Sequence, residues 1–136
     1  MSRSGNEQST ILLIEEDDET RPILRDNLKR NGYLVLLAVD EEDAISRVSG
    51  GHVRADLILI NLVGTSVENT LQIGRRIREH AKFDGTTPLV VMAEKYGKDV
   101  EGTDVNVDGN DWVFYLGEES GQLQHLLQRL LNKPSN

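Results

Sequence analysis

The stretch TILLIEEDDE, residues 10–19, runs from a continuous apolar segment directly into five consecutive acidic residues. A short apolar run of this kind is typical of a strand buried on both faces of a parallel sheet, and the acids then form a charged loop at its carboxyl end. Residues 20–30 place Pro22 in a first helical turn, and Asn31-Gly32 follows as a stop signal. The beginning of the chain therefore predicts a strand, an acidic loop and an amphipathic helix.

Apolar runs and helical periodicities alternate over the rest of the chain. Residues 94–110 contain glycines and many polar residues but no apolar helical stripe, so a helix there is expected to be short, displaced or missing. Strands that alternate with amphipathic helices predict an open parallel sheet with helices on both faces. Further strands are predicted at residues 33–38, 55–60, 88–92 and 112–116, and further helices from the Asp40 cap to Gly50, at 71–81 and at 123–131.

Length and composition limit the class of protein. At 136 residues, with 38% hydrophobic and 28% charged residues, the chain fits one ordinary globular domain. Its net charge of -8 repels nucleic acid and anionic lipid surfaces, so neither is an expected partner. The chain has no cysteine, which excludes disulfides, thiolate nucleophiles and cysteine-held metal sites.

The ends of the chain and its apolar runs indicate location and domain organisation. No apolar run is long enough for a membrane span, and the first residues lack the apolar core of a signal peptide. We therefore expect a cytoplasmic protein. Its organisation is expected to be a disordered segment at residues 1–9, one domain at residues 10–132 and a disordered end at residues 133–136.

Two stretches, in order and spacing, resemble the receiver domain of two-component response regulators. The first is ILLIEED, residues 11–17, followed by Arg21 and by Asn31-Gly32-Tyr33. The second is ADLILIN, residues 55–61, which resembles the strand that carries the family's phosphoacceptor. The resemblance extends from about Ile11 to Leu131. It implies an α/β, flavodoxin-like fold with a five-stranded parallel sheet in the order 2-1-3-4-5 and a site at the carboxyl ends of the strands.

The resemblance also locates the family's catalytic positions, and this sequence departs from them. The family has a nucleophilic aspartate at the end of the third strand, whereas this chain has Asn61, whose neutral amide is a far poorer nucleophile. Ala93 occupies the position of a Ser or Thr hydroxyl, and Tyr115 occupies the position of a Lys. The chain therefore resembles a degenerate receiver, or pseudo-receiver, with no catalytic residue at these positions.

Two acids after the first strand hold Mg²⁺ in the family, and Glu15 and Glu16 occupy these positions here. Glu16 is one methylene longer than the usual Asp, and Asn61 lacks the charge of a further ligand. The expectation is therefore no bound cofactor, with weak Mg²⁺ binding by Glu15 and Glu16 as the alternative. The acidic run also suits the start of a helix without any metal, because the helix dipole favours negative charge there.

The leading interpretation is a stand-alone receiver-like domain of two-component, phosphorelay signalling that is not an enzyme and is not phosphorylated at Asn61. Its partner is expected to be a signalling protein, such as a kinase or regulator, or a second copy of the chain. The expected surface is the face that the fourth helix, fifth strand and fifth helix form in the family. One alternative is an active receiver with another acceptor, such as Asp17 or Asp56. The other is a small-molecule binder on the same scaffold, although the acidic loop would repel a phosphate-bearing cofactor.

Two smaller patterns also give expectations. The basic stretch Arg75-Arg76-Ile77-Arg78 is expected to be a solvated helix face, with the docking of an acidic partner as the alternative. Trp112 and Phe114 are two residues apart on a predicted strand, so they are expected to share one core-facing side.

Overall fold

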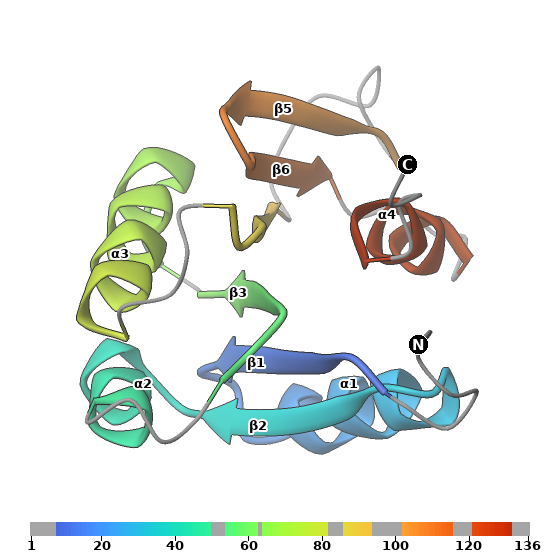
Figure 1. Cartoon of the computed structure of the whole chain (residues 1–136), viewed down its shortest axis with the longest axis horizontal. Helices are drawn as coiled ribbons and strands as arrows, with labels where there is room; N and C mark the ends of the chain where they lie inside the picture. The colour runs from blue at the N-terminus through green and yellow to red at the C-terminus, as the bar shows by residue number, and fades with distance from the viewer. Residues whose placement is uncertain are drawn as a thin grey trace, which may run out of the picture.

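The chain forms six strands and four helices in the part that the computed structural model describes, residues 8–49, 54–62, 64–81, 86–93, 102–115 and 121–131 (Figure 1). None of the helices in these residues is long and apolar enough to cross a membrane. The elements in chain order are β1 (Thr10–Glu15), α1 (Thr20–Arg30), β2 (Leu34–Ala38), α2 (Glu41–Val48), β3 (Leu57–Asn61), α3 (Val67–His80), β4 (Leu89–Ala93), β5 (Asp104–Asp108), β6 (Asp111–Tyr115) and α4 (Gly121–Leu131).

The strands form one sheet in the order β2-β1-β3-β4-β6-β5. The pairs β1–β2, β1–β3, β3–β4 and β4–β6 are parallel, whereas β5 pairs with β6 antiparallel. The predicted parallel sheet in the order 2-1-3-4-5 is therefore confirmed, with β6 as its fifth strand. The addition is β5, which extends the sheet by one antiparallel strand at the edge.

The strand β5 lies where the sequence predicted at most a short helix, whereas its hairpin partner β6 is the strand predicted at residues 112–116. Gly109 turns the chain with a positive φ of 51°, which glycine adopts without a steric penalty. Asn106 holds the turn, because its Nδ2 donates to the carbonyls of Gly109 at 2.9 Å and Asp111 at 3.1 Å. The described part of this connection, from residue 102, is thus a strand and a turn, and residues 94–101 lie outside the described residues.

Two apolar layers cover the two faces of the sheet, and each of its five parallel strands contributes alternate residues to them. Leu12 and Ile14 of β1 pack in the layer beneath α2 and α3, while Ile11 and Leu13 pack in the layer beneath α1 and α4. Figure 1 shows these two helix pairs on opposite sides of the sheet. Burial on both faces explains why β1 reads as a continuous apolar run rather than an alternating one.

The helices α2 and α3 each begin directly after a residue whose side chain caps the first turn. Asp40 caps α2 as predicted, since its Oδ1 accepts from the Asp43 N–H at 2.8 Å. Ser66 caps α3 by accepting from the Asn69 N–H at 3.0 Å, so α3 begins at Val67, ahead of the predicted start at residue 71.

The chain just before β1 is hydrogen-bonded to the end of α1 and the start of β2. Gln8 donates from Nε2 to the Gly32 carbonyl at 2.9 Å, and the Ser9 carbonyl accepts from the Leu34 N–H at 2.9 Å. The other residues of the two segments expected to be disordered, 1–7 and 133–136, lie outside the described residues.

Candidate functional site

The carboxyl ends of the parallel strands bring together the positions that the sequence singled out. Glu15 is the last residue of β1 and lies opposite Asn61, the last residue of β3. Ala93 ends β4 and lies opposite Tyr115, which ends β6. Because neighbouring parallel strands end at one edge of a sheet, these two pairs form a staggered row along that edge. The register sets Ile60 opposite Val91, so Ala93 lies one residue further along than Asn61.

Glu15 and Asn61 form a buried hydrogen-bonded pair at one end of this row. The Glu15 side chain is 0% exposed and Asn61 is 3% exposed. Asn61 donates from Nδ2 to Glu15 Oε1 at 2.8 Å, and the Asp17 N–H donates to Glu15 Oε2 at 3.1 Å. Both carboxylate oxygens therefore already accept hydrogen bonds from the chain itself. Asn61 Oδ1 is buried and has no hydrogen-bond donor among the described residues.

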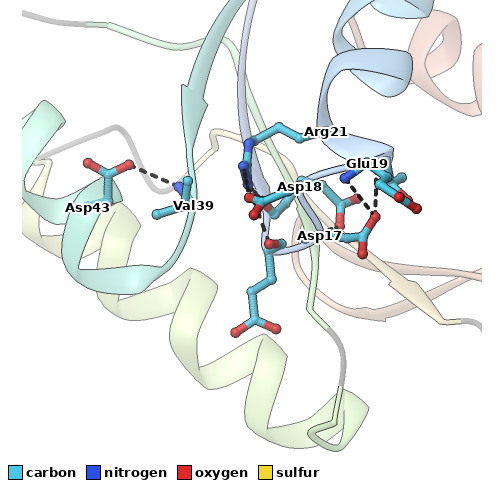
Figure 2. A network of polar contacts seen from close by, with 9 residues as sticks. Asp17, Asp18, Glu19, Arg21, Val39 and Asp43 are labelled. Carbon is cyan, nitrogen blue, oxygen red and sulfur yellow. Dashed lines mark hydrogen bonds and ion pairs between the residues drawn. The ribbon is translucent and has the colours of Figure 1, made fainter.

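The acidic loop after β1 mainly builds the start of α1 (Figure 2). Asp17 Oδ2 accepts from the N–H groups of Glu19 at 3.1 Å and Thr20 at 2.7 Å. Hydrogen bonds from Thr20, the side chain first and the backbone second, lower the pKa of Asp17 below its ordinary value. Asp17 is thus occupied as a helix-capping carboxylate.

Arg21 fixes the same loop from α1. Its Nη1 donates to the carbonyls of Glu15 at 3.0 Å and Glu16 at 3.4 Å, and its Nη2 pairs with the carboxylate of Asp18 (Figure 2). One guanidinium therefore holds the backbone at the end of β1 and neutralises a loop acid. The Glu16 side chain is exposed, in contrast to the buried carboxylate of Glu15.

The other predicted positions contribute little polar chemistry. Ala93 is buried and carries no hydroxyl. Tyr115 is half-buried and packs beside the apolar layer under α2 and α3. A phenol carries no positive charge in either protonation state, so Tyr115 does not supply the cation that a Lys would place beside a phosphoryl group.

The described residues do not fit a Mg²⁺ site. Mg²⁺ requires nearly octahedral oxygen ligands, and carboxylates are its usual protein ligands. Glu15 has both oxygens engaged by the chain, and Asn61 directs an amide N–H toward that carboxylate. Over the described ranges, no group of three or more His, Asp or Glu side chains is arranged to hold a metal ion.

Asp56, the other alternative acceptor, lies away from this row. It precedes β3, at the amino end of the strand that Asn61 ends. Its Oδ2 accepts from the Thr10 N–H at 2.7 Å, which ties the start of β1 to the start of β3. The strand length thus separates Asp56 from the carboxyl-end row.

The prediction of a solvated basic face on α3 holds only for Arg76, which is exposed, whereas Arg75 and Arg78 are partly buried. All three arginines pair with acids of this same chain. Arg76 Nε and Nη2 donate to the two oxygens of Glu41 on α2 at 2.6 and 2.9 Å. Arg75 Nε donates to Asp111 Oδ2 at 2.8 Å. Arg78 Nη1 lies 2.9 Å from Asp111 Oδ1 while it donates to a backbone carbonyl, so this second contact with Asp111 is mainly electrostatic. The arginines of this stretch were equally compatible with ion pairs. The sequence did not show these pairs, because the acidic partners lie far away along the chain.

Trp112 and Phe114 confirm the predicted core-facing side of β6. Both belong to the apolar layer beneath α1 and α4. The Arg129 guanidinium of α4 lies 5.7 Å from the centre of the Trp112 ring and pairs with Asp104 of β5 at 2.7 Å. This contact fastens the hairpin to the last helix.

Comparison with solved structures identifies the fold. A response regulator receiver protein from Sinorhizobium medicae WSM419 is similar with a TM-score of 0.70 at 20% identity, over 93% of this chain and 97% of that chain. The chemotaxis protein CheY4 from Vibrio cholerae gives a TM-score of 0.64 at 19% identity, over 92% of this chain and 100% of that chain. The chain thus has the receiver-type, flavodoxin-like fold.

A third similar structure contains a magnesium ion. It is the receiver domain of the sensor histidine kinase PA1611 from Pseudomonas aeruginosa PAO1, with a magnesium ion coordinated in its active-site cleft. The TM-score is 0.63 at 23% identity, over 93% of this chain and 100% of that domain. No protein-family model and no curated protein match the chain.

Sequence reasoning located the row of strand ends but missed its central contact. Nothing in the linear pattern showed that Asn61 would donate to Glu15, because these residues are 46 positions apart. Only the strand order indicates that Glu15 and Asn61 are neighbours, because adjacent parallel strands end side by side. The hairpin had a more direct signal, the Asp108-Gly109 turn between alternating valines and the aromatic strand.

Proposed function

We propose that this chain is a receiver-like module of two-component signalling that acts by protein contact without phosphorylation at the usual position. The observation that carries the proposal is the buried pair in which Asn61 Nδ2 donates to Glu15 Oε1 at 2.8 Å. A phosphoacceptor must present a nucleophilic oxygen to the donor. Asn61 instead offers a neutral amide whose nitrogen is hydrogen-bonded to a carboxylate.

The neighbouring positions support the same proposal. Phosphoryl transfer depends on cations and hydrogen-bond donors that stabilise charge on the transferred group. Ala93 and Tyr115 provide neither a small hydroxyl nor a permanent cation, and the Glu15 carboxylate is satisfied internally. We infer that the module is not an enzyme, works without Mg²⁺ and operates in the cytoplasm.

The alternative acceptors are less suited. Asp17 caps α1 through two backbone N–H groups, and Asp56 lies at the opposite end of β3. A small-molecule function on this scaffold has no specific observation in its favour, because the loop that would receive a phosphate carries carboxylates.

The test is the intact mass of the purified protein after incubation with acetyl phosphate and Mg²⁺. We expect the wild-type mass to stay unchanged, because no acceptor carboxylate occupies the strand-end row except the engaged Glu15. A phosphoryl group adds about 80 Da, so any adduct is resolved easily. An adduct on the wild-type chain would overturn the proposal.

An Asn61→Asp variant, treated identically, separates two causes of inactivity. If the variant acquires the adduct, the pocket retains the remaining machinery and Asn61 alone prevents the reaction. If it stays unmodified while a working receiver in the same assay is phosphorylated, the rest of the row is disabled as well. Both results are compatible with the proposal, which depends on the wild type.

A further inference from the structure

The open edge of the sheet at β5 has the features of a docking strand. β5 is the last strand in the order, so in the described part of the chain one backbone edge of it pairs with β6 and the other has no strand beside it. Figure 1 shows the hairpin at one end of the sheet, beyond α3 and α4. An edge of this kind offers a row of N–H and C=O groups to an added strand.

Apolar side chains accompany this edge. Val105 and Val107 are each 43% exposed, and every residue of β5 after Asp104 is exposed. Valine is the residue type that favours strands and packs against the alternate side chains of a neighbouring strand. The exposed valines therefore provide apolar contact beside a backbone edge that no described strand covers.

The charges of β5 disfavour the pairing of its edge with β5 of a second copy of the chain. An antiparallel pairing that sets both valines of one copy against both valines of the other centres on Asn106. It places Asp104 of each copy opposite Asp108 of the other, and like charges directly opposite destabilise a strand pair. Both copies also carry a net charge of -8.

We propose that β5 docks an extended segment of another protein in which apolar residues alternate with Lys or Arg. The segment adds to the β5 edge by backbone hydrogen bonds, its apolar residues contact Val105 and Val107, and its cations meet the exposed carboxylate of Asp108, since the carboxylate of Asp104 is already paired with Arg129. This inference rests on the proposed function, because it names the surface and the class of partner for signalling by contact.

The probe is a seven-residue peptide of alternating Lys and Val, blocked at both ends, added to the ¹⁵N-labelled full chain. We expect amide shift changes concentrated on residues 102–108, with saturation below about 1 mM, the weak end of specific binding. The matched control peptide alternates Glu and Val, which keeps the apolar residues and reverses the charge. This control peptide should bind at least about tenfold more weakly than the basic peptide, which is a difference of about 1.4 kcal/mol in the free energy of binding.

Two variants test the location. The double variant Val105→Thr with Val107→Thr keeps β-branched residues and removes apolar surface, so binding of the basic peptide should weaken by about fivefold or more while the fold is kept. Val39→Thr is the matched control, because Val39 is 42% exposed and follows β2 at the far side of the sheet. It should bind the peptide as the wild type does.

Three results would overturn the inference: no binding of the basic peptide, shift changes centred elsewhere, or equal weakening by Val39→Thr. A wild-type dimer in sedimentation that the double valine variant abolishes would identify a second copy as the occupant and would also overturn it. The proposed function fails by a different result, a phosphoryl adduct on the wild type, so the two failures are distinguishable.

Discussion

Asn61 differs from an aspartate by one amide nitrogen, and that nitrogen is the atom that contacts the buried carboxylate of Glu15. A buried carboxylate is stable only where hydrogen bonds or opposite charges replace its hydration. Here the amide of Asn61 and the N–H of Asp17 provide them. The residue that removes the nucleophile thus also stabilises the folded state.

Replacement of Asn61 by Asp is therefore expected to destabilise the protein at neutral pH. It would set two carboxylates in hydrogen-bond contact in a buried place, at a cost of about 3 kcal/mol. Such a pair raises one folded-state pKa, so the folded variant binds a proton that the unfolded chain lacks. The variant should regain stability relative to the wild type as the pH falls from about 7 to about 5. Urea unfolding at several pH values measures this.

A second variant controls for simple damage at the site. Glu15→Gln combined with Asn61→Asp exchanges the two groups and restores a carboxylate beside an amide. This double variant should recover a large part of the lost stability, so the two substitutions should not be additive. Additive losses would show that the pair does not interact as described.

At the scale of elements, α3 packs so closely against β4 that the backbone at Gly74 has no room for a Cβ atom. A Cβ added there would lie 2.5 Å from Leu89 Cδ1 and 3.1 Å from Ile60 Cδ1. Leu89 and Ile60 are 0% exposed, so neither side chain has room to move aside. We expect Gly74→Ala to lower the free energy of unfolding by about 1–3 kcal/mol through overpacking. Gly121→Ala is the control, because nothing lies within 4 Å of its added Cβ. Equal effects of the two substitutions would contradict the packing argument.

The ion pair between Glu41 of α2 and Arg76 of α3 makes a pH-dependent contribution to the free energy of unfolding. A side-chain hydrogen bond from Arg76 is the main cause that lowers the pKa of Glu41 below its ordinary value of 4.5. A carboxyl with a lowered folded-state pKa stabilises the fold above its unfolded pKa, and this stabilisation is lost as the pH falls through the folded value. Arg76→Gln should thus lower the free energy of unfolding slightly at neutral pH and almost not at all near about pH 3.

Denaturant unfolding at the two pH values tests this ion pair. Arg76→Lys keeps the charge but loses the two-pronged contact with Glu41, so it should fall between the wild type and Arg76→Gln. A loss that is as large at low pH as at neutral pH would point to packing of the side chain rather than to the ion pair.

The elements also show where sequence reasoning succeeds. The strands β1, β3 and β4 were predictable because burial on both faces requires unbroken apolar runs. The strand β5 was missed because its alternating Val105 and Val107 lie among acids and Asn106, so the segment reads as a polar loop. The strand pairs with β6 through a local turn, and Asp104 also pairs with Arg129 of α4, a contact that local sequence does not encode.

At the scale of the whole molecule, the location of the site was predictable and its internal contacts were not. The resemblance to receiver domains implied the strand order, and that order sets Glu15 and Asn61 side by side at the sheet edge. The direction of each side chain depends on competing partners from several elements. Arg75 shows this, because it pairs with Asp111 from a strand 36 residues later.

The same architecture predicts a gradient of stability across the sheet. Every residue of β3 and β4 is buried, whereas β5 is exposed and lies at the edge. Segments with few buried apolar contacts open with lower free energies than the core strands. Amide hydrogen exchange should thus be slow in β1, β3 and β4 and at least about 100-fold faster in β5 and its neighbouring turn.

Two amides provide a matched comparison for this gradient. The Ile58 N–H donates to the Pro88 carbonyl at 2.9 Å in the centre of the sheet, and the Gly102 N–H donates to the Tyr115 carbonyl at 2.8 Å at the hairpin. Their hydrogen bonds are of nearly equal length, so a difference in exchange must come from the surrounding packing and not from the bond itself. Equal protection at the two amides would mean that the hairpin unfolds only with the core. β5 would then be an integral part of the receiver-type sheet rather than an edge that opens on its own.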